Sequence, residues 1–420
     1  MIKLRTLKCG VRVVMDQTNY LQSASIGFWI RTGSVDEDKK YAGISHFVEH
    51  MMFKGTEHRT AKEIAADIDK TGGQINAFTS KEATCYYVKT LSANLISSTE
   101  VLIDMLVNSK FDKKEMSRER KVIVEEIKMI QDAPDEDAHE MINKIIYKGS
   151  PLGNSIAGTE SSLKNISQNV MREYVKNEYT RDNIVVAITG NFDEDEICGY
   201  LEDKLISLGE SKVKKEHEIL PYEPGFKVKA KDIEQTHFFI GVPSIDLFDK
   251  RHYAMTVLSN IMGGSMSSRL FQAVREQKGL AYSVYCVHSA STMGGSFMIY
   301  AGVSHDNVGE AIEAIKEELE ILKRDGVTLE ELNKAKEQLK SSFIFGQENV
   351  ATKMFSIGKA ITLVGKAKTD KEVLELIDAI TLEDLDEVSK IITNIKNYSG
   401  ASVSNKKFNL KKMVLGEKND

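Results

Sequence analysis

The chain has 420 residues, of which 41% are hydrophobic and 28% are charged, and its formal net charge at pH 7 is −6. This composition is typical of a soluble globular protein, and the length exceeds what one hydrophobic core usually holds, so we expect at least two domains. The slightly acidic balance gives no basis for a nucleic-acid partner. No stretch approaches the roughly 18 consecutive apolar residues of a transmembrane helix, and the N-terminus lacks the apolar segment of a signal peptide, so we expect no membrane partner.

The cysteines are dispersed along the chain and form no C-x-x-C pair. They are Cys9, Cys85, Cys198 and Cys286. Such spacing favours reduced, buried thiols over a metal or redox motif, and it leads us to expect a cytoplasmic protein.

The N-terminal part of the sequence alternates between strand and helix signals. Residues 3–15 alternate between apolar and polar side chains, which predicts two short strands around a turn, and residues 24–32 form a third β-rich run. Segment 43–53 contains strong helix formers, no proline and apolar residues spaced by three and four, which predicts a helix. A second helix is predicted over residues 60–70.

Helix 43–53 contains two histidines and a glutamate on one side. His46 and His50 are four residues apart, which places them about 40° apart around the helix and roughly 6 Å apart along its axis. They can therefore direct both imidazoles at one metal ion, and Glu49 faces the same side. Two histidines at this spacing can also be surface or capping residues. Burying them with a carboxylate in an apolar helix is costly unless they are paired or bound to metal, which favours the metal site.

The remainder of the first half is predicted to be largely helical. Two paired strands are expected at 73–80 and 84–90. Helices are expected at 95–108, 113–131, 136–147 and 170–179, and a core strand at 182–190. The proline in Asp132-Ala133-Pro134-Asp135 is expected to end the second of these helices.

Residues 212–231 are the expected linker, because they are charged, contain Pro221 and Pro224 and lack helical periodicity. We therefore expect a first domain at 1–211 and a second at 232–420. The second half repeats the order of strand and helix signals of the first half. The expected fold class is α+β, with two tandem homologous sandwich domains, each an antiparallel-rich sheet with helices on one face.

The order H-x-x-E-H inverts the H-E-x-x-H signature of zinc proteases. With it, the chain resembles the inverzincins, the pitrilysin-like zinc metallopeptidases, in the short two-repeat form of mitochondrial processing peptidase β-type subunits. The resemblance implies a Zn²⁺ ion held by His46, His50 and a glutamate on a later helix, for which Glu126 fits. Glu119, two turns earlier, matches the family's supporting acid. Glu125 is the competing ligand, although it points about 100° away from Glu126.

The internal repeat predicts that only the first domain binds metal. When residues 327–332 are matched to 111–116, Glu126 corresponds to Ser342 and Glu119 to Ala335. The helix predicted at 253–260 has no histidine pair at the ligand spacing.

The resemblance also implies a substrate-binding strand at 73–80, onto which an extended peptide is added. The residues concerned are Asn76, Ala77, Phe78 and Thr79. An edge strand offers unpaired backbone groups to any extended peptide, so such binding selects weakly among sequences. An ordinary edge hairpin remains the alternative.

The second domain contains a glycine-rich turn at 263–264, followed by a predicted helix at 268–278 and a strand. The family has an arginine and a tyrosine seven residues apart at this place, and Arg275 and Tyr282 fit. The resemblance implies that they bind the substrate backbone and stabilise the oxyanion. Arg269 is the alternative arginine, and a surface helix with ordinary charges is the simpler interpretation.

These features together predict a zinc-dependent endopeptidase that hydrolyses short or unfolded peptides, with Glu49 as the general base. Because the metal and the Arg–Tyr pair lie in different repeats, family analogy implies a clam-like homodimer, or a heterodimer with a metal-free relative. A non-catalytic structural or peptide-binding relative of the family is the alternative function.

Overall fold

The computed structural model describes residues 2–210 and 221–416. The chain forms two compact units, and each is assembled from three separate segments. The described segments of the first unit are residues 2–127, 154–210 and 344–370. Those of the second unit are residues 128–153, 221–343 and 371–416. No helix in these described residues is long and apolar enough to cross a membrane.

The first unit contains a six-stranded sheet in the order β1-β2-β6-β3-β5-β4. The strands are β1 (Lys3–Thr6), β2 (Arg12–Gln17), β3 (Ser23–Ile30), β4 (Gln74–Thr79), β5 (Thr84–Leu91) and β6 (Ile184–Gly190). All neighbouring strands are antiparallel except β2 and β6, which are parallel. The strand predicted at 73–80 is therefore an edge strand, as expected.

Helices of the first half pack on one face of this sheet. They are α1 (Ile44–Met52), α2 (Ala61–Lys70), α3 (Leu95–Asn108), α4 (Lys113–Asp132), α6 (Glu160–Asn165), α7 (Gln168–Glu178) and α8 (Glu194–Leu205), of which α4 continues into the second unit. Ile26 and Phe28 of β3 share a buried apolar cluster with Phe47 of α1 and Leu102 of α3. Apolar side chains at helical spacing on α1 and α3 produce this core.

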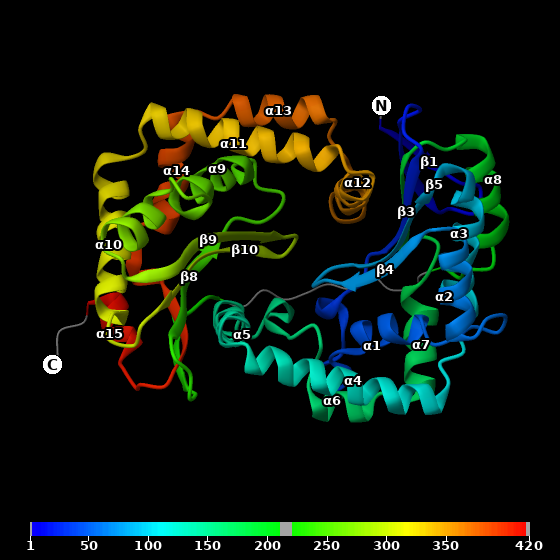
Figure 1. Ribbon diagram of the computed structural model, residues 1–420, viewed down its shortest axis with the longest axis horizontal. Helices are drawn as coiled ribbons and strands as arrows, with labels where there is room; N and C mark the ends of the chain where they lie inside the picture. The colour runs from blue at the N-terminus through cyan, green and yellow to red at the C-terminus, as the bar shows by residue number, and fades with distance from the viewer. Residues whose placement is uncertain (1, 211–220, 417–420) are drawn as a thin grey trace. The chain divides into compact units, whose positions relative to one another are not determined.

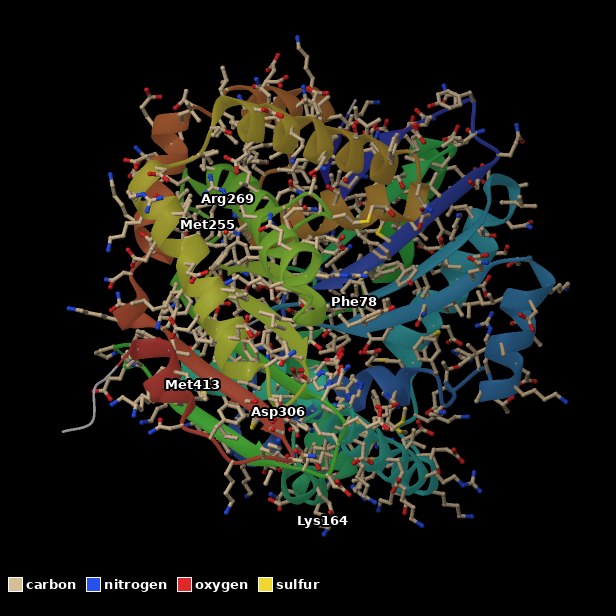
Figure 2. The ribbon with its side chains drawn as sticks, turned by 60° about the vertical axis from the view of Figure 1, so that its left-hand side comes forward. Phe78, Lys164, Met255, Arg269, Asp306 and Met413 are labelled. Atoms are coloured by element: carbon tan, nitrogen blue, oxygen red, sulfur yellow. The ribbon has the colours of Figure 1, made fainter. Side chains whose placement is uncertain are left out.

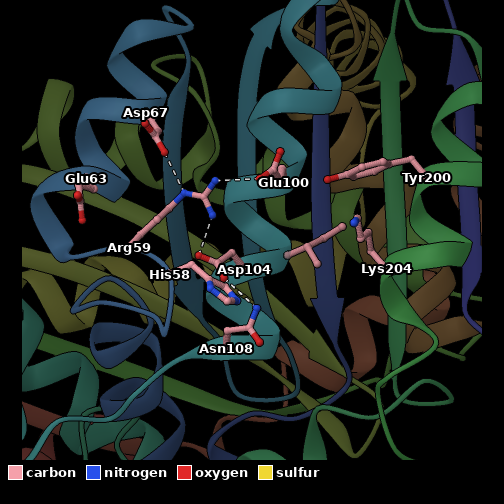
Figure 3. A pocket seen from close by; sticks show the side chains of 10 residues that line it. His58, Arg59, Glu63, Asp67, Glu100, Asp104, Asn108, Tyr200 and Lys204 are labelled. Atoms are coloured by element: carbon pink, nitrogen blue, oxygen red, sulfur yellow. Dashed lines mark hydrogen bonds and ion pairs between the residues drawn. The ribbon is translucent and has the colours of Figure 1, made fainter.

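Arg59 ties α2 to α3. Its guanidinium donates to the carboxylates of Asp67 on α2, at 2.9 Å, and of Glu100 and Asp104 on α3, at 3.0 and 2.8 Å (Figure 3). Thr60 caps α2 by accepting from the Glu63 backbone N–H, while the Glu63 carboxylate accepts from the Thr60 N–H. The charged side chains between α2 and α3 therefore have a structural role, because they join the two helices.

The opposite face of the first sheet is covered by α12 (Val350–Val364), a helix from the second half of the sequence (Figure 1). Gly358 allows the helix to approach, because a Cβ at this position would lie 2.1 Å from the Trp29 indole nitrogen. The Lys353 ammonium on the helix is 2.9 Å from the Asp16 carboxylate of β2, and both side chains are largely buried.

The second unit contains a five-stranded sheet in the order β7-β11-β8-β10-β9. Its strands are β7 (Phe226–Ala230), β8 (Thr236–Ser244), β9 (Ala281–Ser291), β10 (Gly294–Val303) and β11 (Ser399–Ser404). The helices from the second half of the sequence in this unit are α9 (His252–Gly263), α10 (Val308–Asp325), α11 (Leu329–Gln347), α13 (Asp370–Asp378), α14 (Leu382–Ile392) and α15 (Leu410–Leu415). The last residues of α11 belong to the first unit.

A helix from the first half, α5 (Pro134–Ile146), covers the opposite face of the second sheet. Its Ala138, Met141 and Ile142 pack against Phe239 of β8 and Val403 of β11. The exchange of α5 and α12 explains why neither unit is a continuous stretch of sequence. The predicted consecutive domains at 1–211 and 232–420 would assign α5 to the first sheet and α12 to the second, the reverse of what the structure shows. The sequence also predicted helices on one face of each sheet, whereas helices cover both faces.

Two further details differ from the sequence prediction. Residues 212–220 of the expected linker 212–231 lie outside the described residues, whereas residues near its end form strand β7. The helix predicted at 268–278 is wound as a π-helix over Phe271–Gln277. Such widened turns are rare and are frequent at functional sites.

Candidate active site

A buried carboxylate fixes the start of α1. Glu37 accepts hydrogen bonds from the backbone N–H groups of Gly43, at 2.7 Å, and Ser45, at 2.8 Å. Burial raises the pKa of Glu37 to about 7, and these hydrogen bonds act in the opposite direction. Gly43 has φ of +90°, and a Cβ there would lie 2.6 Å from the Ala157 carbonyl oxygen. The first turn of the helix therefore has one well-defined position.

His46, His50 and Glu126 converge in the first unit, and one ligand atom from each lies within 4.8 Å of the others. Glu126 Oε2 is 3.7 Å from His46 Nε2 and 3.5 Å from His50 Nε2. Two ligands in a tetrahedral zinc site, each about 2.0 to 2.1 Å from the ion, lie about 3.3 Å apart. The three side chains therefore fit zinc with only small adjustments.

The neighbouring residue Glu125 does not belong to this group. Its side chain is exposed, whereas Glu126, on α4, is half-buried and faces the two imidazoles. The rotation of about 100° between consecutive helical residues accounts for the difference.

Burial favours the neutral imidazole that a metal requires. It lowers the pKa of His46 to about 4, and the nearby His50 contributes in the same direction. His46 Nδ1 is buried and has no hydrogen-bond partner among the described residues.

Glu119 contacts the second histidine. Its Oε2 is 3.1 Å from His50 Nδ1, and its Oε1 is 2.8 Å from Lys54 Nζ. A carboxylate in this contact accepts, so Nδ1 bears the proton and Nε2 is left for the metal. Lys54 was not predicted from the sequence. Its spacing of four residues from His50 was the available signal, because it places Lys54 on the histidine side of α1 and the following turn.

Glu49 lies beside these candidate ligands, and its carboxylate contacts the edge strand β4. Its Oε2 accepts a hydrogen bond of 2.5 Å from the Thr79 hydroxyl. Burial raises the pKa of Glu49, while hydrogen bonds from the side chain and backbone of Thr79 act in the opposite direction. The sequence placed Thr79 with the substrate-binding residues and did not predict its contact with Glu49.

The other predicted substrate-binding residues on β4 differ in the contacts that they make. Asn76 Oδ1 accepts from the Ala77 backbone N–H at 2.8 Å. Phe78, labelled in Figure 2, packs against Trp29 and Phe355, with ring centroids 5.5 and 5.6 Å away. Phe78 therefore lies on the α12 face, opposite the face that α1 contacts.

Arg275 and Tyr282 lie together in the second unit. The Arg275 guanidinium is 4.7 Å from the ring centre of Phe271 and 5.1 Å from that of Tyr282, whose side chain is 77% exposed. By contrast, Arg269 (labelled in Figure 2) forms a two-point ion pair with Glu331, at 2.6 and 2.8 Å, and donates to the Gly326 carbonyl. Arg269 is thus engaged within the fold.

The second unit lacks the corresponding metal ligands. Its helix α9 has the sequence HYAMTVLSNIMG and is mostly buried, and Ala335 and Ser342 occupy the positions on α11 that match Glu119 and Glu126. The only group of three or more metal-ligating side chains among the described residues is therefore the one in the first unit.

Two sandwich units, one bearing an inverted H-x-x-E-H helix and a downstream glutamate, define a short pitrilysin-like protein of the zinc-protease type. The sequence comparisons agree with this class. Residues 12–160 match the family model described as insulinase (peptidase family M16), and residues 165–339 match the model described as the peptidase M16 inactive domain. The chain belongs to peptidase family M16.

Its relatives extend over nearly the whole chain. An uncharacterised zinc protease of Bacillus subtilis (strain 168) is 41% identical over 410 residues, which cover 96% of this chain and 98% of the relative. One from Rickettsia felis is 37% identical, covering 93% and 94%. The crystal structure of a protease from Helicobacter pylori has a TM-score of 0.90 at 22% identity, covering 96% and 99%, which supports the fold.

Proposed function

We propose that the chain is a zinc-dependent endopeptidase that hydrolyses short or unfolded peptides. The observation that supports this best is the convergence of His46, His50 and Glu126 beside the half-buried carboxylate of Glu49. A structural zinc site has no need of a further acidic group that is adjacent to the ligands and separately held by a hydroxyl.

Three side chains would hold the ion, and Glu119 would orient one of them. A zinc ion with three protein ligands and one open position lowers the pKa of a bound water to about 7. His46 and His50 contribute neutral nitrogen donors, and Glu126 contributes one negative charge. Lys54 and Glu119 together add no net charge to this group.

Glu49 would move the proton. Because its Oε2 accepts the Thr79 hydroxyl, we assign the proton transfer to Oε1. Glu49 takes a proton from the attacking water as the new C–O bond forms at the peptide carbonyl. It then delivers that proton to the amide nitrogen as the C–N bond breaks, which returns the carboxylate to its starting state.

The substrate would be held through its backbone. The open edge of β4 supplies N–H and C=O groups to an extended peptide, so we expect loose sequence selectivity. Arg275 and Tyr282 would bind the peptide backbone and stabilise the oxyanion. The exposure of Tyr282 and the engagement of Arg269 with Glu331 favour Arg275 for this role.

We further propose that the active form is a homodimer, because one chain contains both the metal ligands and the Arg–Tyr pair. A heterodimer with a metal-free relative would supply the same groups. The four free cysteines, three of them buried, favour a reducing compartment and thus a cytoplasmic enzyme.

Metal analysis combined with a cleavage assay tests this proposal. We expect zinc to copurify at about one ion per chain and a quenched, unstructured peptide of about 15 residues to be cleaved. Chelation should abolish cleavage, and added zinc should restore it. Zinc without cleavage, alone or after mixing with candidate partner chains, would favour a non-catalytic peptide-binding relative. Absence of zinc would contradict the proposal.

A further inference from the structure

Thr79 is the last residue of β4, the edge strand of the first sheet. Its hydroxyl donates to Glu49 Oε2 at 2.5 Å, and its backbone also forms a hydrogen bond with the Glu49 carboxylate. One residue of the strand therefore supplies two donors to the carboxylate that we assign as the base.

The alternation of side chains along β4 explains how Thr79 reaches Glu49. Ile75 and Ala77 pack against the apolar core that includes α1, whereas Phe78 packs on the other face with Trp29 and Phe355. Residues two apart in a strand share a face, so Thr79 lies on the α1 side with Ile75 and Ala77. Its branched side chain has few rotamers, which limits where the hydroxyl can point.

A buried carboxylate needs donors, and its partners decide its rotamer. Glu49 is half-buried, so a carboxylate oxygen without a donor would be costly. Hydrogen bonds to ionised groups are roughly twice as strong as those between neutral groups. The Thr79 hydroxyl therefore holds Oε2, and a second contact from the backbone of the same residue leaves the carboxylate little freedom to rotate.

We propose that Thr79 is a positioning residue, which fixes the Glu49 carboxylate against β4 and so aligns the base with any peptide added to that strand. This inference rests on the proposed peptidase function. A peptide paired with β4 takes its register from that strand. The same strand, through Thr79, sets the position of Glu49 Oε1, so the base and the peptide are aligned with each other. Thr79 is thus distinct from Asn76, whose side chain accepts a hydrogen bond from the Ala77 backbone N–H within the strand.

The chain contains a matched control for this role. Thr84 lies directly opposite Thr79 in the pairing of β4 and β5, and its hydroxyl donates to the Thr32 carbonyl at 2.9 Å. Thr84→Val removes a buried hydroxyl and one hydrogen bond from the same pair of strands without touching Glu49. Thr79→Ser retains the hydroxyl at the position of interest.

The test compares Thr79→Val, Thr79→Ser and Thr84→Val as zinc-loaded full chains, with kcat, KM, zinc content and thermal unfolding measured for each. We expect Thr79→Val to lower kcat by about ten- to a hundredfold, with KM and zinc content near those of the parent. Thr79→Ser should recover most of the lost kcat, and Thr84→Val should keep the parent kcat.

Several results would overturn the assignment. These are a parent-like kcat for Thr79→Val, a loss confined to KM, an equal loss of kcat in Thr79→Ser, or an equal loss in Thr84→Val. A parent chain that binds zinc and cleaves no peptide would instead overturn the proposed function, and with it the inference. The two failures are therefore distinguishable by the behaviour of the parent.

Discussion

The two units contain the same kind of sheet but differ in the chemistry of the helices around it. In the first unit, α1 presents His46, Glu49 and His50, and α4 presents Glu126. In the second unit, α9 has no pair of histidines at this spacing, and α11 has Ala335 and Ser342 where α4 has Glu119 and Glu126. The second family model, described as an inactive domain, agrees with this difference. The sandwich can therefore fold without the metal ligands.

The exchanged helices show a second contrast between the units. On the first sheet the strand contributes the acid, Asp16, and the helix contributes the base, Lys353. On the second sheet the strand contributes the base, Lys229, and the helix contributes the acid, Asp137, at 2.5 Å. The two ion pairs have opposite polarity, so each helix carries the charge that complements the sheet it covers.

The largest effect is expected from removing the third metal ligand. Glu126→Gln should lose zinc and reduce peptide cleavage to background, because a neutral amide is a poor zinc ligand. Glu125→Gln is the matched control on the adjacent, exposed position and should keep both properties. Zinc content and cleavage rates of the two variants measure the contrast. Equal behaviour of the variants would contradict the assignment of the ligand.

A smaller effect is expected from the arginines of the second unit. Arg275→Met should lower kcat by about 10²- to 10³-fold while leaving thermal stability near that of the parent. Arg269→Met should mainly lower stability, because it leaves the Glu331 carboxylate without its two-point partner. Steady-state kinetics and thermal unfolding separate the two roles. The reverse pattern would assign the substrate contact to Arg269.

The ion pair on α12 should contribute to stability. Lys353→Met leaves the Asp16 carboxylate largely buried beside the exchanged helix, with a loss of about 2 to 4 kcal/mol in the free energy of unfolding. Replacing both partners, as in Asp16→Leu with Lys353→Met, should recover much of that loss because no charge is left buried. Denaturant unfolding of the single and double variants provides the test, and additive losses would argue against a coupled pair.

The smallest effect concerns the support of His50. Lys54→Met should weaken zinc binding by about tenfold, because Glu119 loses the cation that holds it against the imidazole. Lys54→Arg should retain more of the affinity, and Lys62→Met, at an exposed position on α2, should have no effect. Competition with a chelator measures the affinities. Unchanged zinc affinity in Lys54→Met would show that Glu119 orients His50 without this cation.

Local sequence signals predicted most of the elements and the three side chains that converge in the first unit. The helix α3 has the predicted bounds 95–108, and Pro134 separates α4 from α5 as expected. The spacing of His46 and His50 sufficed to place them on one side of a helix. Periodicity and breakers act over a few residues, so they are visible without knowledge of the tertiary structure.

The features that the sequence did not predict depend on long-range contacts. The pattern of α12 shows that one face is apolar, but not which sheet that face covers. The contact of Thr79 with Glu49 joins residues 30 positions apart, and that of Lys54 with Glu119 joins the turn after α1 to helix α4. The π-helix around Arg275 likewise has no periodicity signal of its own.

The most direct test of the central claim is the Glu49→Gln variant of a parent chain that contains zinc and cleaves peptide. Because Glu49 is assigned to proton transfer and not to metal binding, the variant should retain zinc while kcat falls by about 10²- to 10⁴-fold. Parent-like cleavage by a zinc-loaded Glu49→Gln chain would contradict Glu49 as the base, and with it the mechanism proposed for the site.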